Sequence, residues 1–358
     1  MLIDHITKEP TVWERLQAET RPVVLYGMGD GAEKILRVFA EKGIRASGVF
    51  ASDEFVRGHD FAGFRVKKLS DLTAELGEDL VVVLSFASQR PEVLEKFYEL
   101  DARFDMVAPD VPVVGEGLFD REYLTANLDK FSEAFDLMAD ETARRCFSDI
   151  VNFKLTGEIR YLRACETDKD EVFRSILRAS EAEHFADLGA YNGDTIRELL
   201  SYTDGKFASI TALEPDGRTF RKLRAYADEH LTGDVTLVNA GVWSQDTTMT
   251  FAARAGRNSA LAAKGIETQM RALDSVLDGR PCTLLKYDIE GAERKGLLGA
   301  AQTIRRYAPK LNLACYHRNE DLFDLTLLVH ALCPSHKLYL RHHPYVPAWD
   351  VNLYAAPN

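Results

Sequence analysis

The chain has 358 residues, 46% of them hydrophobic and 28% charged, a balance typical of globular proteins, and its length suggests about two domains. Its formal net charge of −12 argues against a nucleic-acid partner, because binding to a phosphate backbone depends on clustered lysine and arginine. No apolar run approaches the roughly 20 residues of a membrane span, and residues 1–5 lack a secretion-signal pattern, so we expect a cytoplasmic protein.

The first 110 residues predict a small parallel α/β domain of the Rossmann type. Apolar strands are expected at residues 22–26, 46–50, 80–85 and 104–107. The first strand runs into a turn containing Gly27, Gly29 and Gly31, and an amphipathic helix follows. Two interpretations of this turn are open. It could bind NAD, with Asp53 as the ribose acid after the second strand, or it could serve plain strand–helix packing.

The layout of this region resembles the N-terminal Rossmann-like domain of bacterial sugar N-acyltransferases that act on nucleotide sugars. The shared features are the glycine turn, a strand that ends near an acid, a hairpin-like segment at residues 60–66 and a valine-rich strand. This resemblance implies a sugar-linked binding or docking module more than a dehydrogenase.

Residues 111–180 lose the strand pattern and predict a helical connector. Apolar side chains recur there at helical spacing, as at Phe131, Phe135 and Met138. Five cysteines are scattered over the chain without C-x-x-C spacing, which indicates buried apolar residues rather than disulfides or a zinc site.

A cofactor cradle is predicted where residues 181–358 begin. An apolar strand ends in Asp187, small residues follow at Gly189, Ala190 and Gly193, and a helix starts near Asp194. Glycine lets the backbone approach a ligand closely. The order is D-x-G-x-x-x-G-D rather than the G-x-G-x-x-G of dinucleotide-binding turns, and the flanking acids would repel a pyrophosphate.

The same acids could hold an amine or a hydroxyl, as found in S-adenosylmethionine. The next strand, residues 210–213, ends in Glu214, which is placed to accept hydrogen bonds from both ribose hydroxyls. The acid-flanked glycine turn and Glu214 together favour S-adenosylmethionine over NAD. The plain alternative is an ordinary βαβ crossover with an N-capping aspartate.

Further strands are expected along the rest of the chain, at residues 235–242, 248–251, 284–288, 310–315, 337–341 and 351–354. The last two are joined by a short loop containing Pro344 and Pro347, so they should pair antiparallel. The predicted fold is therefore α/β, with a class I methyltransferase sheet that carries a reversed C-terminal hairpin. The small N-terminal domain (1–110) and the connector (111–180) precede this domain (181–358).

Five segments of the last domain resemble the FkbM family of S-adenosylmethionine-dependent methyltransferases in order and spacing. They are DLGAYNGDT, ALEPD, LLKYDIEGAERKGLLGA, CYHRNEDL and YLRHH. The resemblance implies methyl transfer to a hydroxyl of a sugar, glycan precursor or other natural product. The residues that match its first cofactor motif are Asp187, Gly189, Ala190, Tyr191, Gly193 and Asp194. Glu214 matches the ribose acid, and Asn239 and Gly241 lie where adenine is expected.

Asp288, Glu290 and His317 are the candidate catalytic residues. Alternate residues of an extended segment face the same way, so both carboxylates can point into one pocket beyond a strand end. The two carboxylates could take a proton from the acceptor hydroxyl, hold that hydroxyl in position, or ligate a divalent cation. We favour positioning with base assistance. Glu290 could instead only favour a helix N-terminus.

His317 follows the next strand, and a near-neutral pKa would suit a general base. Either His342 or His343 could line the acceptor entrance, but not both, since neighbours on a strand face opposite ways. One of these histidines could form a metal site with His317 and Asp288, but that set is poor in oxygen ligands and is not supported by the spacing, so no metal is assigned.

The leading hypothesis is an S-adenosylmethionine-dependent O-methyltransferase whose partner is a small-molecule or glycan acceptor. The alternative is an NAD-binding oxidoreductase or nucleotide-sugar enzyme centred on Gly27, Gly29 and Gly31. The sequence makes no prediction of the oligomeric state.

Overall fold

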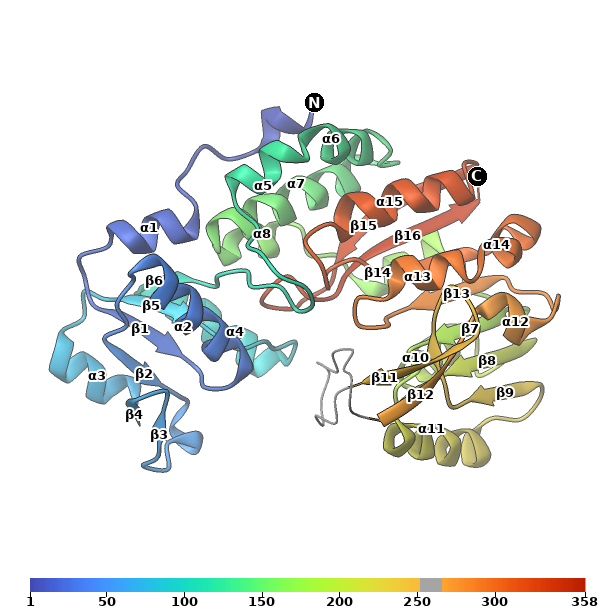
Figure 1. The fold of residues 1–358 in the computed structure, drawn as a ribbon, viewed down its shortest axis with the longest axis horizontal. Coiled ribbons are helices and arrows are strands. Elements are labelled where there is room, and N and C mark those ends of the chain that lie inside the picture. Colours follow the sequence, from blue (N-terminus) through green and yellow to red (C-terminus); the bar gives the residue numbers. More distant parts are fainter. Residues whose placement is uncertain (252–265, 358) are drawn as a thin grey trace.

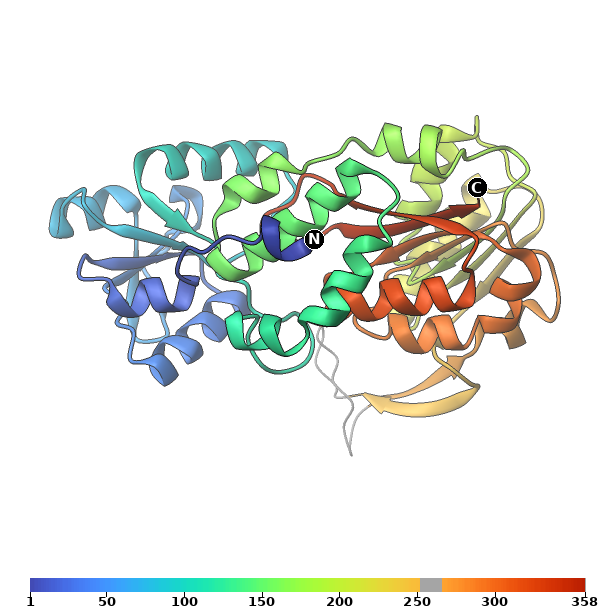
Figure 2. The same cartoon turned by 90° about the horizontal axis from the view of Figure 1, so that it is seen from above.

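A computed structural model describes residues 1–251 and 266–357. Two β-sheets lie at opposite ends of an elongated molecule, and a group of helices lies between them (Figures 1 and 2). The N-terminus lies beside this central group, and the C-terminus lies at the end of the last strand (Figure 1). Within the described residues, no helix combines the length and the apolar character that crossing a bilayer demands.

The first sheet is built by the N-terminal residues and has the order β3-β4-β2-β1-β5-β6. All its pairings are parallel except that of β3 with β4, the predicted hairpin. Its strands are β1 (Val23–Tyr26), β2 (Gly48–Phe50), β3 (Asp60–Phe61), β4 (Phe64–Lys67), β5 (Val81–Leu84) and β6 (Asp105–Val107). The helices of this part are η1 (Leu2–His5), α1 (Val12–Ala18), α2 (Asp30–Lys42), η2 (Asp53–Phe55), α3 (Leu69–Leu76) and α4 (Pro91–Arg103).

The central helices connect the two sheets, as the loss of strand pattern predicts. They are α5 (Arg121–Ala126), α6 (Leu128–Asp136), α7 (Glu141–Thr156), α8 (Ile159–Ala164), α9 (Lys169–Glu171) and the π-helical turn η3 (Val172–Ile176). Aspartates start several of them: the side chain of Asp120 caps α5 and that of Asp140 caps α7. The longest, α7, ends at Gly157, which adopts a left-handed conformation.

The second sheet has the order β15-β16-β14-β13-β7-β8-β9. Its strands are β7 (His184–Leu188), β8 (Ser209–Leu213), β9 (Val235–Val238), β13 (Leu284–Tyr287), β14 (Lys310–Ala314), β15 (His336–His342) and β16 (Val351–Pro357). Only β16 runs against its neighbours, and its antiparallel pairing with β15 confirms the prediction from the short loop. The helices are α10 (Asp194–Tyr202), α11 (Gly217–His230), α12 (Leu273–Leu277), α13 (Glu293–Leu298), α14 (Ala301–Tyr307) and α15 (Asp321–Leu332).

One predicted strand, residues 235–242, is wrong in its extent. The chain leaves the large sheet after β9, and Gly241–Val242 form β10 of a separate three-stranded sheet with β11 (Thr247–Phe251) and β12 (Ile266–Arg271). The strand is interrupted at Asn239, because its side-chain amide donates to the carbonyl oxygens of Glu214 (2.8 Å) and Pro215 (3.1 Å). This long-range anchor cannot be recognised from an apolar run.

One of three buried hydrophobic clusters among the described residues continues from one sheet to the other through the central helices. It includes Val82 under the first sheet, Phe131 and Phe147 from α6 and α7, and Leu285 and Leu313 under the second. The rings of Phe131 and Phe323 are 4.8 Å apart, which joins α6 to α15. All five cysteines are buried and free, as predicted.

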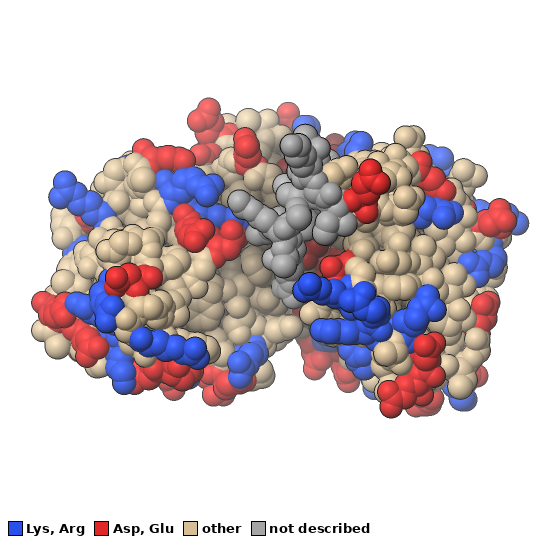
Figure 3. Space-filling model, turned by 60° about the horizontal axis from the view of Figure 1, so that its bottom comes forward, with Lys and Arg blue, Asp and Glu red and all other residues tan. Residues whose placement is uncertain are grey.

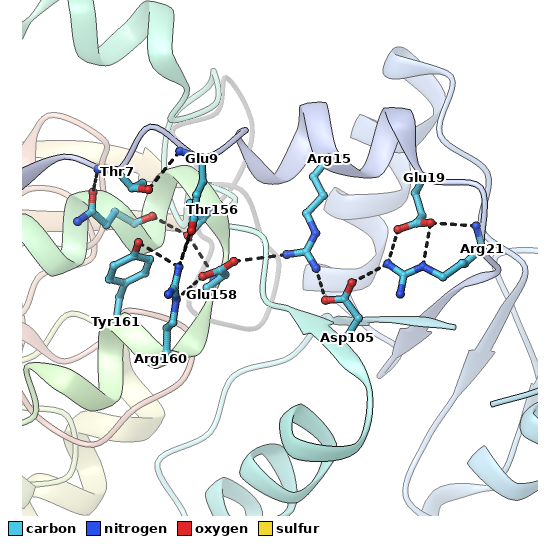
Figure 4. Close-up of polar contacts among 11 residues, drawn as sticks. Thr7, Glu9, Arg15, Glu19, Arg21, Asp105, Thr156, Glu158, Arg160 and Tyr161 are labelled. Carbon is cyan, nitrogen blue, oxygen red and sulfur yellow. Dashed lines mark hydrogen bonds and ion pairs between the residues drawn. The ribbon is translucent and has the colours of Figure 1, made fainter. Parts of the chain in front are cut away.

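Ion pairs reinforce the junction between the first sheet and the central helices (Figure 4). Arg15 of α1 pairs with Asp105 at the start of β6 and, at 3.6 Å, with Glu158 before α8. Arg21 also reaches Asp105, at 2.6 Å, and Arg160 reaches Glu9 at 2.8 Å. The side chains of Arg15, Arg21 and Asp105 are 27%, 31% and 30% exposed, and partly exposed pairs of this kind contribute little energy each.

Candidate active site

The predicted cofactor cradle lies at the carboxyl end of β7. The chain turns at Gly189, which has a φ of 84°, and a Cβ there would overlap the carbonyl oxygen of Asp288. Gly193 has a φ of 85°, and a Cβ there would lie 2.8 Å from the ring of Tyr226. Both positions therefore demand glycine, and the first brings the turn directly onto the end of β13.

Asp187 is fully buried beneath this turn. Neither of its carboxylate oxygens has a hydrogen-bond partner among the described residues, although the ammonium of Lys286 is 3.2 Å away. Burial raises the pKa of Asp187 to about 6, and Lys286 opposes part of that rise. A buried carboxylate with free lone pairs is suited to a ligand that brings its own donors.

Lys286 was not singled out in the sequence. Its side chain, buried in β13, donates to the carbonyl oxygen of Gly189 at 2.8 Å while it faces Asp187. Lys286 therefore links Asp187 to the glycine turn. The available signal was a lysine inside an apolar strand, since such a residue is rarely buried without a partner.

Glu214 lies beside the same turn, at the end of β8. Its carboxylate accepts hydrogen bonds from the backbone N–H groups of Tyr191 (3.0 Å) and Asp216 (2.8 Å). Burial raises the pKa of Glu214 to about 7, against the lowering effect of these two N–H groups. Tyr191 has a φ of 46° and is 48% exposed, which is unusual for a large residue.

The remaining predicted cofactor residues occupy different positions around the cradle. Ala190 is buried and its N–H bonds to the carbonyl of Leu213, whereas Asp194 is exposed in the first turn of α10. Asn239 shapes the loop after Glu214 through the two hydrogen bonds described above. Gly241 packs closely on Met270, whose sulfur a Cβ would approach to 2.5 Å, so packing alone explains this glycine.

The three candidate catalytic residues come together beyond β13 and β14. Nε2 of His317 lies 3.4 Å from Oδ1 of Asp288 and 3.6 Å from Oε2 of Glu290. The histidine is buried, and the two acidic side chains are each 40% exposed. Glu290 has a φ of 53°, a conformation that costs energy and often marks a functional position.

A fourth member of this group, Glu293, was missed. It is the first residue of α13, and its Oε1 lies 3.0 Å from Nδ1 of His317 and accepts from the N–H of Ile289 at 2.9 Å. Burial would lower the pKa of His317, but the charge of Glu293, with those of Asp288 and Glu290, raises it to about 10. The expected near-neutral pKa is thus wrong, because a neighbouring helix supplies an acid that was not considered.

The connector covers one side of this group. The N–H of Val114 donates to the carbonyl oxygen of His317 at 3.0 Å, and the side-chain amide of Asn319 donates to the carbonyl oxygen of Gly117 at 3.3 Å. The loop that carries His317 therefore faces the N-terminal half of the chain.

The expectation for His342 and His343 is wrong, since both are buried and hydrogen-bonded. Nε2 of His342 lies 3.1 Å from the carbonyl oxygen of Tyr345, and His343 contacts the carbonyl oxygen of Thr167 at 2.8 Å. Because β15 packs against the chain before α9, neither histidine can line an entrance for the acceptor.

The N-terminal glycine turn has a different environment. A Cβ on Gly27 would lie 2.6 Å from the ring of Phe86, and one on Gly31 would overlap the carbonyl oxygen of Ser85. Gly29 has open space around it, and Asp53 pairs with Lys68 at 3.0 Å. Close packing explains two of the three glycines.

Comparisons with known proteins concern the fold and the family of the second half of the chain. A search of curated proteins finds no match. The structure of methyltransferase FkbM from Methylobacillus flagellatus superposes with a TM-score of 0.74 at 23% identity, over 94% of this chain and 90% of that one, so the fold is shared along nearly the whole chain.

A weaker overlap, with a TM-score of 0.34 and 12% identity, is found with precorrin-6y C5,15-methyltransferase from Geobacter metallireducens, over 51% of this chain and 84% of that one. The second sheet has the Rossmann-like arrangement of methyltransferases, and residues 187–345 match the family model of the methyltransferase FkbM domain. Residues 187–345 of this chain are therefore a methyltransferase domain of the FkbM type.

Proposed function

We propose that this protein transfers a methyl group from S-adenosylmethionine to a hydroxyl of a sugar, a glycan precursor or another natural product. One observation carries the proposal. The turn that follows Asp187 touches the strand end that bears Asp288, so a ligand held by the turn would lie beside the acidic group around His317.

The residues of the cradle fit this cofactor. Asp187 pairs with Lys286 through Oδ1 and keeps Oδ2 for the donors of an amino acid moiety, and Glu214 keeps lone pairs for ribose hydroxyls. Asp187 and Asp194, which flank the glycines of the turn, would repel the pyrophosphate of NAD. These two acids, with Glu214 for the ribose, therefore favour a sulfonium nucleoside.

The chain's own residues would position the acceptor. S-adenosylmethionine, when bound, supplies an electrophilic methyl group, so the acceptor oxygen must be held in line and must lose its proton. Asp288 and Glu290 are exposed enough to reach that hydroxyl, and a carboxylate oxygen of Asp288 can accept its proton. His317, kept protonated by Glu293, holds both carboxylates in place rather than acting as the base.

The surface beside the cradle narrows the choice of acceptor. Helix α11, which follows Glu214, carries exposed cations at Arg218, Arg221, Lys222 and Arg224. Lysine and arginine side chains gather on the face seen in Figure 3, next to the hollow between the two halves of the molecule. An acceptor with a phosphate or carboxylate substituent would be attracted to such a rim.

Calorimetry of the whole protein with S-adenosylmethionine and with NAD tests the proposal. We expect saturable binding of S-adenosylmethionine alone, and binding of NAD alone would overturn the proposal in favour of the N-terminal glycine turn. A screen of sugars and natural products, with and without phosphate groups, then identifies the acceptor by a mass gain of one methylene.

A further inference from the structure

Three side chains beside the proposed methyl-transfer site offer ligand atoms that all lie within 4.8 Å of one another: Asp288, Glu293 and His317. They come from three separate segments, namely the end of β13, the start of α13 and the loop after β14. The tertiary structure, and not local sequence, brings two oxygen ligands and one imidazole to one place. This donor set is common for divalent metal ions of the first transition row.

The state of Glu293 points independently to a missing ligand. Its side chain is 1% exposed, and only Oε1 is engaged, by Ile289 and His317. The other oxygen, Oε2, is buried and has no hydrogen-bond partner among the described residues. Burying a carboxylate oxygen without a partner is costly, and a cation bound there would remove that cost.

The charges of the group also favour a cation. Three carboxylates, those of Asp288, Glu290 and Glu293, surround one histidine. Even a protonated His317 leaves an excess of negative charge in a largely buried place. A divalent ion would balance that excess. It would take the place of a proton on the His317 imidazole, and that proton would be released to solvent when the metal binds.

We propose that Asp288, Glu293 and His317 form a binding site for one divalent transition-metal ion, of which Mn²⁺ and Zn²⁺ are the probes. The imidazole ligand disfavours Ca²⁺, which prefers oxygen ligands only. Asp288 is 40% exposed, so a small molecule can reach this side of the group. The catalytic part of this inference rests on the proposed function: a metal ion there would polarise the acceptor hydroxyl and assist its deprotonation.

The test uses the whole protein after treatment with a chelator. Titration with Mn²⁺, followed by calorimetry and by loss of the free Mn²⁺ signal in electron paramagnetic resonance, should show one ion per chain. Asp288→Asn and Glu293→Gln should each weaken Mn²⁺ binding by about ten-fold or more. His184→Ala is the matched control, because His184 lies at the opposite end of the same sheet, and it should leave the affinity unchanged.

S-adenosylmethionine binding is measured on the same samples, without metal, so that the two proposals can fail separately. Absence of saturable Mn²⁺ and Zn²⁺ binding in a protein that binds S-adenosylmethionine overturns the metal site and leaves the methyltransferase proposal intact. Equal metal affinity in the parent, the Asp288→Asn variant and the His184→Ala control also overturns it. Asp288 lies on a partly exposed loop, so this comparison remains decisive if Glu293→Gln does not fold.

Discussion

The two glycine turns of this chain share a sequence pattern, but their glycines make room for different groups. Each follows a buried strand and leads into an amphipathic helix whose first residue is an aspartate, Asp30 or Asp194. In the first turn, the missing side chains make room for Ser85 and Phe86. In the second, Gly189 makes room for the backbone of Asp288, and Asp187 is buried beside it. The two turns therefore differ in buried charge more than in glycine spacing, and that difference is the reason why the proposed cofactor site is placed at the second turn.

The helix after the first turn is also connected to the loop of His317. Nζ of Lys34, in the helix after the first turn, donates to the carbonyl oxygens of Pro112 (3.1 Å) and Val113 (3.3 Å). The next residue, Val114, donates to the carbonyl oxygen of His317. The N-terminal region thus supports the loop that carries a candidate catalytic residue.

The largest expected effect comes from the buried acids of the second turn. Asp187→Ala and Glu214→Ala should abolish detectable S-adenosylmethionine binding, because the donors of the cofactor lose their acceptors. Asp288→Ala and His317→Ala should spare most of that binding and lower turnover by about 10²-fold or more. Calorimetry and single-turnover kinetics measure the two effects. Equal loss of cofactor affinity in all four variants contradicts this division.

The next prediction compares glycines of the two turns. Gly189→Ala places a methyl group on the carbonyl oxygen of Asp288 at a positive φ, so both the melting temperature and cofactor affinity should fall sharply. Gly31→Ala overlaps the carbonyl oxygen of Ser85 and should lower the melting temperature alone. Loss of S-adenosylmethionine affinity in Gly31→Ala would show that the first turn also serves the cofactor.

Cofactor affinity should depend on pH. The ionised forms of Asp187 and Glu214 accept hydrogen bonds, and their pKa values are raised to about 6 and about 7. Between about pH 8 and pH 5.5, S-adenosylmethionine affinity should therefore fall by roughly 10²-fold. Glu214→Gln, which does not titrate, should show a flatter profile from a weaker starting affinity.

The stability of the unliganded protein should change in the opposite sense. A carboxyl group whose pKa is raised in the folded state contributes stability at low pH and loses it as the pH rises through the folded value. For Glu214 that window extends from its usual pKa near 4.5 to about 7. Denaturant unfolding should thus find Glu214→Gln more stable relative to the parent at pH 8 than at pH 4. An unchanged difference would show that Glu214 is not held in this costly ionised state.

The smallest expected effect lies in the link between α2 and the loop of His317. Lys34→Gln removes the ammonium that holds residues 112 and 113, so the loop of His317 should lose part of its support. Turnover should fall a few-fold while S-adenosylmethionine affinity stays the same. Lys42→Gln, at the other end of the same helix, is the control. Identical kinetics for both variants would mean that the contact has no influence on the reaction.

Much of the fold could be predicted from local patterns. The strand–turn–helix around Asp187 and the reversed pairing of β16 both follow from short stretches of sequence. The split of residues 235–242 could not be predicted, because it depends on a side chain that reaches back to Glu214. Strand β12 was missed because its sequence, IETQMR, has no apolar run and is stabilised by pairing with β10 and β11.

The sequence by itself determined the order of the elements and the residue types at the strand ends, since both depend on neighbours in the chain. Only the tertiary structure decided which charges meet. Lys286 faces Asp187 because their strands are adjacent and in register, and Glu293 reaches His317 because α13 packs beside the end of β14. Buried charges interact strongly over short distances, so these contacts, and not the motifs alone, set the chemistry of the site.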